Sequence, residues 1–250
     1  MRELNNTISV ITGGSKGIGK SIAELFAKNG SKVIIIYNKS KSSAVSVKNK
    51  IILSGGSCEI YKLDLSKKNN YKNLFSYVFK KYKKIDILVN NAGYLKQMNY
   101  LNIDHKEWFR TIDTNLTSVF FLSQAFARYL KKQKFGNIIN ISSIGGQTGG
   151  VKAPHYAAAK LAIISLTKSF SRLLAPFNVR VNAISPGIIE TDLVKKMIKN
   201  EGRSKIEKNI PLKKIGNTNN IADTALFLAS KKSNYMTGQV LNVNGGQFLG

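Results

Sequence analysis

A tyrosine and a lysine four positions apart, Tyr156 and Lys160, are the residues of this sequence best suited to acid–base chemistry. The alanines between them predict a helix, which would place both side chains one turn apart on the same face. A tyrosine hydroxyl has a pKa near 10, but a cation about 4 Å away contributes roughly 4 kcal/mol, or about three pKa units. We therefore expect Lys160 to lower the pKa of Tyr156 and make it a usable proton donor and base.

Two serines end the apolar segment that lies before this tyrosine. Residues 137–143, Asn-Ile-Ile-Asn-Ile-Ser-Ser, are typical of a buried strand. Open α/β sheets bind their ligands at the carboxyl ends of the strands, which is where Ser143 would lie. We expect the neighbouring Ser142 to support the strand end instead of the chemistry.

A glycine-rich turn follows the first predicted strand and opens directly into a helix. Residues 12–19 read Thr-Gly-Gly-Ser-Lys-Gly-Ile-Gly, and such a turn lets backbone N–H groups and a helix N-terminus approach a phosphate. Dinucleotide binding is the natural hypothesis. The same segment also matches the nucleoside-triphosphate pattern G-x-x-x-x-G-K-S, from Gly14 to Ser21.

The triphosphate alternative needs further residues that the sequence does not supply. It requires Lys20 on the phosphates, Ser21 on magnesium and a second apolar strand ending in a metal-binding Asp. Asp86 stands near the start of its strand, and Asp64 follows residues 59–63, which are not apolar enough. We expect Lys20 and Ser21 to be ordinary helix residues.

The residues after the second strand bear on the choice of nicotinamide cofactor. An NAD-specific site places a carboxylate there to bind the adenosine ribose, whereas this chain has Asn38, Lys39 and Ser40. Lys39 could pair with a 2′-phosphate, and Lys16 offers a second cation. NADPH is favoured over NADH. The alternative is that both lysines belong to a general lysine excess and face solvent.

Short β-branched segments alternate with amphipathic segments along the whole chain, which is typical of βαβ units and a parallel sheet. We predict a single-domain Rossmann-type α/β fold over residues 1–250, a doubly wound parallel sheet flanked by helices. The predicted strands are 7–11, 32–37, 85–89, 137–141, 179–184 and 239–243. The predicted helices include 18–29, 71–83, 105–133, 156–175 and 221–230. Residues 188–216, polar and weakly periodic, are expected to form a mobile lid or substrate loop.

Composition narrows the class of protein. A chain of 250 residues with 43% hydrophobic content can bury a sizeable core, and no segment approaches the roughly 20 apolar residues of a membrane span. With Cys58 as its one cysteine, the chain can form no internal disulfide or thiolate metal cage, so we expect no metal and a cytoplasmic protein.

The formal charge of +26 raises the question of a nucleic-acid or membrane partner. The excess is mostly lysine, and it is spread over nearly every surface segment instead of forming one patch. A lysine-rich coding bias explains this distribution, and we expect no nucleic-acid or membrane partner. Such a surface would still attract acidic proteins and phosphates.

The order and spacing of these motifs resemble the short-chain dehydrogenase/reductase family over the whole chain. The resemblance extends to Asn-Asn-Ala-Gly at 90–93, Pro-Gly-Ile-Ile-Glu-Thr-Asp at 186–192 and Val-Asn-Gly-Gly at 243–246. It implies hydride transfer between a nicotinamide and a carbonyl or alcohol carbon. By the same resemblance, Tyr156 is the general acid and base, Lys160 holds the nicotinamide ribose, Ser143 binds the substrate oxygen and Asn115 completes a proton relay.

The resemblance also implies which residues bind NADP(H). They are Gly13, Ser15, Lys16, Gly17, Ile18, Gly19, Asn38, Lys39, Ser40, Asp64, Leu65, Asn91, Ala92, Gly93, Tyr156, Lys160, Pro186, Gly187, Ile189 and Thr191. His155 and His105, which could be suspected of acid–base work, are expected to be structural, because Tyr156 already fills that role.

Within the family, the chain length and residues 210–216 look most like bacterial 3-oxoacyl-acyl-carrier-protein reductases of fatty acid biosynthesis. This likeness implies a 3-oxoacyl thioester substrate, an acidic acyl carrier protein as partner and a homotetramer. The chain departs from that pattern: Lys96-Gln97 replaces the usual Arg-Asp, and of two basic carrier-docking positions near the cleft, Lys134 matches one while Phe177 occupies the other.

Two alternatives to this substrate stay open. A reductase or dehydrogenase of a free small ketone, sugar or polyol would use the same catalytic residues. A basic nucleic-acid or membrane binding module with a vestigial cofactor site belongs to a different class, and the intact set of four catalytic residues argues against it.

Overall fold

The computed structural model describes residues 2–67 and 71–250, so that Met1, where the predicted domain begins, lies outside the described residues. Its seven strands form one parallel sheet in the order β3-β2-β1-β4-β5-β6-β7. The predicted strand bounds differ from the observed ones by at most two residues. The strands are β1 (Ile8–Thr12), β2 (Lys32–Tyr37), β3 (Ser57–Lys62), β4 (Ile87–Asn90), β5 (Gly136–Ile141), β6 (Val179–Pro186) and β7 (Val240–Val243).

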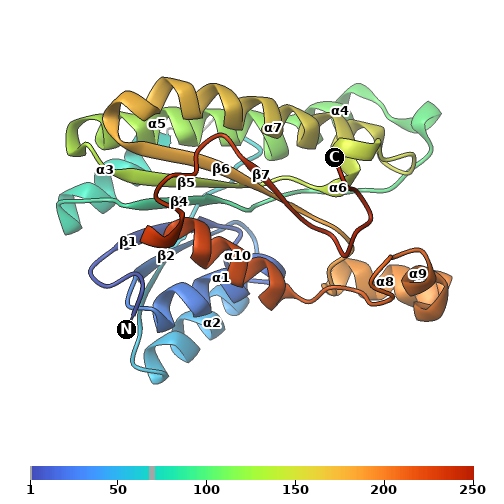
Figure 1. Cartoon of the computed structure of the whole chain (residues 1–250), viewed down its shortest axis with the longest axis horizontal. Coiled ribbons are helices and arrows are strands. Elements are labelled where there is room, and N and C mark those ends of the chain that lie inside the picture. The colour runs from blue at the N-terminus through green and yellow to red at the C-terminus, as the bar shows by residue number, and fades with distance from the viewer. Residues whose placement is uncertain (1, 68–70) are drawn as a thin grey trace.

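Helices cover both faces of this sheet, which confirms the predicted fold class (Figure 1). On one face lie α1 (Gly17–Lys28), α2 (Lys41–Leu53) and α10 (Thr218–Ala229), and on the other lie α3 (Tyr71–Tyr82), α5 (Ser118–Gln133) and α7 (Pro154–Leu174). The shorter helices are α4 (His105–Ile112), α6 (Ile144–Thr148), α8 (Asp192–Glu201) and α9 (Arg203–Lys208), with 3₁₀ turns at Tyr100–Asn102, Ala175–Phe177 and Lys231–Ser233. Within the described residues, none of the helices is long and apolar enough to cross a membrane.

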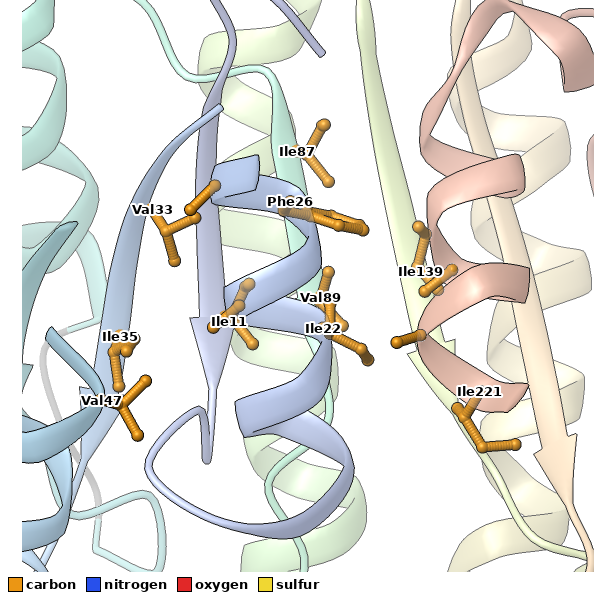
Figure 2. Close-up of a cluster of buried hydrophobic side chains, with 14 of the residues drawn as sticks. Ile11, Ile22, Phe26, Val33, Ile35, Val47, Ile87, Val89, Ile139 and Ile221 are labelled. Carbon is orange, nitrogen blue, oxygen red and sulfur yellow. The ribbon is translucent and has the colours of Figure 1, made fainter. Parts of the chain in front are cut away.

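Side chains of the central strands alternate between the two layers of helices, because successive residues of a strand point to opposite faces. Ile11, Val89 and Ile139 face α1 and α10, where they meet Phe26 and Ile221 (Figure 2). Their neighbours in sequence belong to the other buried cluster, in which the rings of Phe75 and Phe126 lie 5.2 Å apart. With both faces covered, the central strands β1, β2 and β4 are mostly apolar, as parallel strands usually are.

The strand order reverses between β1 and β4: β2 and β3 follow β1 on one side, and β4 to β7 follow on the other. A crevice forms at such a switch point, outside the carboxyl ends of the strands. The glycine-rich turn after β1, residues 91–93 after β4, Ser143 after β5 and residues 187–191 after β6 therefore all meet at one edge of the sheet.

The predicted helix over residues 105–133 is divided in the structure. A π-helical turn, Asp113–Thr117, joins α4 to α5. Periodicity does not reveal such a turn, because one extra residue shifts the apolar stripe without interrupting the helix.

Residues 188–216 fold into α8 and α9, although their helical periodicity is weak. Ile206, Ile210 and Ile215 are buried there and pack with Val194 and Met197. This small cluster explains how a polar, lysine-rich segment keeps a defined structure. Its mobility stays a prediction.

Candidate active site

A cavity of about 910 Å³ occupies the carboxyl edge of the sheet, bounded by the glycine-rich turn, the ends of β4, β5 and β6, and α8. Of the predicted site residues, Gly17, Gly19 and Asn115 do not line it. The predicted residues that do line it are Gly13, Ser15, Lys16, Ile18, Asn38, Lys39, Ser40, Asp64, Leu65, Asn91, Ala92, Gly93, Ser143, Tyr156, Lys160, Pro186, Gly187, Ile189 and Thr191.

The glycine-rich turn brings the N-terminus of α1 against the end of β4. Gly13 has a φ of +66°, a backbone conformation that favours glycine. A Cβ atom on Gly19 would lie 2.3 Å from the side-chain nitrogen of Asn91 and 2.5 Å from the carbonyl oxygen of Gly13, so Gly19 permits close approach even though it does not face the cavity.

The start of α1 has the donors that a phosphate requires. No side chain caps the helix N-terminus, so its first N–H groups remain available to an anionic ligand. Together with the volume of the cavity and the glycines that let a ligand approach the backbone, this arrangement fits a dinucleotide.

Thr12, the first residue of the glycine-rich segment, has a role that the sequence did not predict. Its side-chain oxygen accepts hydrogen bonds from the backbone N–H groups of Asn91 and Ala92, both at 3.0 Å. The Asn91 side chain donates back to the Thr12 carbonyl at 2.9 Å. These bonds join the ends of β1 and β4, and the one available signal was a threonine at the end of an otherwise apolar strand.

Asp64 and Lys39 belong to the part of the cavity formed by the ends of β2 and β3. Burial raises the pKa of Asp64, but hydrogen bonds from Ser66 and Asn38 and the charge of Lys67 outweigh it and hold the pKa below its usual value. The Ser66 backbone and hydroxyl both donate to one carboxylate oxygen, at 3.0 and 2.7 Å. Asp64 is thus an ionised acceptor at neutral pH. The exposed side chain of Lys39 lines the same end of the cavity.

Ser143, Tyr156 and Lys160 converge at the centre of the cavity. The hydroxyls of Ser143 and Tyr156 are hydrogen-bonded to each other. Lys160 is buried, and its ammonium donates to the Ile141 carbonyl at 2.8 Å and lies 5.6 Å from the centre of the Tyr156 ring. Ser142 is buried behind them, where its hydroxyl donates to the Lys160 carbonyl at 2.7 Å and joins β5 to α7.

The pKa of Tyr156 is raised in this structure, so the prediction that it would be lowered is wrong here. Burial raises it, and the hydrogen bond with Ser143 offsets only part of that effect. Lys160 makes no hydrogen bond to the Tyr156 hydroxyl; its ammonium lies 5.6 Å from the ring centre and donates to the Ile141 carbonyl instead. Burial also lowers the pKa of Lys160 to about 8.

Asn115 lies in the π-helical turn, buried and with its side chain already engaged. Its amide donates to the carbonyls of Tyr94 and Thr111, at 2.8 and 2.9 Å, and its side-chain oxygen accepts from the Tyr94 N–H at 3.1 Å. The side chain therefore holds the loop after β4. Gly93 lies beside it, because a Cβ atom there would be 3.0 Å from the Asn115 side-chain oxygen and 3.8 Å from the Lys160 ammonium.

The substrate end of the cavity is lined by residues that carry no motif, so the sequence analysis did not name them as site residues. They include Tyr94, Leu95, Gln97, Arg110, Thr114, Lys152, Val194 and Met197. They come from the loop after β4, from α4, from the π-helical turn, from the loop before α7 and from α8.

Several residues considered in the sequence analysis lie away from the cavity. The Ser21 hydroxyl donates to the Thr218 hydroxyl at 2.7 Å, which joins α1 to α10, and Lys20 lies 4.0 Å from Glu24. His155 is fully buried and does not line the cavity. His105 is exposed at the surface.

Lys134 and Phe177, the two positions compared with carrier-docking residues, also lie away from the cavity. Lys134 ends α5 just before β5, and Phe177 stands just before β6, so both lie at the edge of the sheet opposite Ser143. The expectation that they flank the cleft of their own chain is therefore wrong. The strand pattern agrees with this placement, because both residues lie just before a predicted strand, at 137–141 and 179–184, and so belong to its amino end.

This fold and this site define an oxidoreductase that uses a nicotinamide cofactor and acts on CH–OH or C=O groups. The family model described as Enoyl-(Acyl carrier protein) reductase matches residues 13–247. The chain belongs to the short-chain dehydrogenase/reductase family.

Curated relatives cover nearly the whole chain. It is 37% identical over 249 residues to a 3-oxoacyl-[acyl-carrier-protein] reductase of Aquifex aeolicus, covering 98% of this chain and 99% of that protein. It is 39% identical over 249 residues to the same enzyme of Chlamydia muridarum, covering 97% and 98%. A crystal structure of a candidate gluconate dehydrogenase from Agrobacterium tumefaciens is 29% identical and superposes with a TM-score of 0.94, covering 98% of this chain and 97% of that one.

Proposed function

We propose that this chain reduces the 3-oxo group of acyl thioesters carried by an acyl carrier protein, with NADPH as the hydride donor. The observation that carries the proposal is the convergence of Ser143, Tyr156 and Lys160 in one cavity that also contains the glycine-rich turn. The names of the curated relatives supply the substrate class, and both relatives described above align over almost their full length.

The catalytic roles follow from the positions of the hydroxyls and the ammonium. A bound nicotinamide supplies a hydride to the carbonyl carbon. Tyr156 gives its proton to the carbonyl oxygen, and Ser143 donates a hydrogen bond to that oxygen as negative charge develops. The raised pKa keeps Tyr156 protonated at neutral pH, which suits a proton donor in the reductive direction. Lys160 stabilises the tyrosinate that remains and binds the nicotinamide ribose.

Two lysines support NADPH over NADH. Lys16 and Lys39 both line the cavity next to Asn38 and Ser40, and neither of their ammonium groups has an ion-pair partner among the described residues. Asp64, the one carboxylate among the described residues that line the cavity, already accepts two hydrogen bonds from Ser66. A 2′-phosphate bound at this end of the cavity would thus meet two unpaired cations.

We also propose that the chain forms a homotetramer. Large apolar side chains lie exposed on the outer helices of the face that α5 and α7 cover, which a second subunit would bury. They are Trp108, Phe109, Phe121, Leu161 and Leu173.

The test is a comparison of substrates under one set of conditions. Acetoacetyl-acyl-carrier-protein, crotonyl-acyl-carrier-protein and gluconate with the oxidised cofactor would be assayed beside one another, each with phosphorylated and unphosphorylated nicotinamide dinucleotide. The proposal predicts preferential reduction of the acetoacetyl thioester with NADPH. Faster turnover of the crotonyl thioester would favour the enoyl reduction that the family description names, and faster turnover of gluconate would favour a sugar-acid dehydrogenase.

Ionic strength tests the acidic carrier separately. If the carrier docks on this basic surface, added salt should raise the KM for the carrier-bound substrate far more than the KM for a small uncharged ketone. Equal responses of the two substrates would reject docking by charge.

A further inference from the structure

The substrate end of the cavity carries positive charge and no carboxylate among the described residues that line it. Arg110 and Lys152 line this end, whereas Asp64 lies at the opposite end. Lys152 is already paired with Glu201 of α8 at 2.6 Å. Arg110 is therefore the cation at this end that remains available to a ligand.

The guanidinium of Arg110 is held in place by an aromatic ring. Its central carbon lies 4.0 Å from the centre of the Tyr94 ring, the geometry of a cation–π contact. A guanidinium stacked on a ring keeps its N–H donors in the plane of the group free for a bidentate acceptor. Among the described residues, none accepts a hydrogen bond from Arg110.

The backbone of Tyr94 is itself held by two hydrogen bonds, so the arginine has a defined position relative to the catalytic residues. The Tyr94 backbone N–H and carbonyl are both bound by the Asn115 side chain. Its hydroxyl lies near Glu107, which is buried and has a carboxylate oxygen 3.4 Å from the ammonium of Lys96. Gly93, the residue before Tyr94, also lines the cavity.

We infer that Arg110 binds an anionic oxygen group of the substrate, a carboxylate or a phosphate, and so selects charged carbonyl compounds over neutral ones. A guanidinium that is stacked on a ring and keeps its N–H donors free is well suited to bind such groups. The inference rests on the proposed function in taking this cavity as the site of carbonyl reduction. The anion has two possible sources: the phosphate of a phosphopantetheine arm, or a carboxylate on the acyl or sugar chain.

Three thioesters that differ in charge separate these sources. Acetoacetyl-pantetheine is neutral, acetoacetyl-4′-phosphopantetheine carries a phosphate on the arm, and 3-oxoadipyl-pantetheine carries a carboxylate on the acyl chain. Each would be assayed with the wild type, with Arg110→Gln and with Lys106→Gln. Lys106 is the matched control, because it is an exposed cation of the same helix that does not line the cavity.

The expected result is a rise of roughly tenfold or more in KM for one anionic thioester in Arg110→Gln, since a hydrogen bond to a charged group is lost. The KM for the neutral thioester should change far less than that for the affected anionic thioester, and Lys106→Gln should behave as wild type with all three. Arg110→Lys should restore part of the affinity. The thioester that is affected identifies the source of the anion. An equal effect of Arg110→Gln on all three substrates, or none on any, would overturn the inference.

Binding gives a readout that needs no turnover. By calorimetry on the protein saturated with oxidised cofactor, 4′-phosphopantetheine is compared with pantetheine, and gluconate with glucose. We expect wild type to prefer the anionic member of at least one pair, and Arg110→Gln to lose that preference. A preference retained by the variant, or absent from the wild type, would overturn the inference. Loss of the preference in a protein that reduces no thioester would reject the proposed function and leave the inference standing.

Discussion

Burial changes the pKa values of both Lys160 and Tyr156. The Lys160 ammonium is buried and donates to the Ile141 carbonyl, and burial lowers its pKa to about 8 while it raises the pKa of Tyr156. Tyr156 therefore holds its proton firmly, and the charge that would stabilise the tyrosinate is present only while Lys160 is protonated.

This arrangement predicts the pH dependence of reduction. A lysine whose pKa is lowered to about 8 loses its positive charge as the pH rises through that value, well before an exposed lysine would. We expect kcat for the reductive direction to fall with an apparent pKa near 8, measured by steady-state kinetics at saturating NADPH and substrate. A rate that stays constant up to pH 10 would contradict this role for Lys160.

Lys39 carries the prediction of cofactor choice. Reversing its charge in Lys39→Glu should raise the KM for NADPH by roughly tenfold or more, because a charge-assisted contact with the 2′-phosphate becomes repulsive. The KM for NADH should stay the same or fall. Lys41→Glu is the control, since Lys41 is an exposed cation near the start of α2 that does not line the active-site cavity. If both variants raise the two KM values equally, Lys39 does not select the cofactor.

At the scale of the elements, Thr12 holds the ends of β1 and β4 in register at the switch point. Its side-chain oxygen accepts from two backbone N–H groups of residues 91 and 92, and its substitution would leave both without that partner.

The expected result for Thr12→Val is a loss of about 2 kcal/mol or more in the free energy of unfolding, because buried donors without acceptors are costly. The KM for NADPH should also rise, since residues 91–93 line the cofactor cavity. Thr12→Ser retains the hydroxyl and should lose much less. Urea denaturation and cofactor titration measure the two effects, and a Thr12→Val protein as stable as the serine variant would argue against this role.

The sequence predicted those elements and site residues whose local pattern reflects their environment. The buried strands are rich in β-branched residues and were predicted to within two residues. The motifs at their carboxyl ends meet at the cavity because parallel strands share one edge. The side-chain bonds of Asn115, the raised pKa of Tyr156 and the stacking of Arg110 on Tyr94 depend on residues distant in sequence. No periodicity or spacing encodes those contacts, so they could not be predicted.

At the scale of the whole molecule, the net charge and the exposed apolar side chains favour two different kinds of binding partner. The net charge of +26 favours an acidic carrier, whereas the exposed apolar side chains of α4, α5 and α7 favour other copies of the chain. Because Lys134 and Phe177 lie at the edge opposite the cavity, a carrier reaching this cleft has to dock on other basic residues of the same chain or on a second subunit.

The oligomer is tested by one substitution on that apolar face. Phe121→Asp places a charge on α5 where a partner helix would pack, and Leu53→Asp places the same charge on an exposed apolar residue of α2. Sedimentation velocity should show a tetramer for wild type and for Leu53→Asp, and smaller species for Phe121→Asp. A monomeric wild type, or a Phe121→Asp tetramer, would reject this interface.

The central claim is that Tyr156 supplies the proton in a nicotinamide-dependent carbonyl reduction. Tyr156→Phe removes one hydroxyl and keeps the ring, so NADPH oxidation at saturating acetoacetyl thioester is the most direct measurement, with NADPH affinity determined in parallel by fluorescence. We predict a loss of about a hundredfold or more in kcat, as expected for removal of a general acid, with cofactor affinity unchanged. A variant that retains both wild-type kcat and wild-type cofactor affinity would contradict the proposed mechanism.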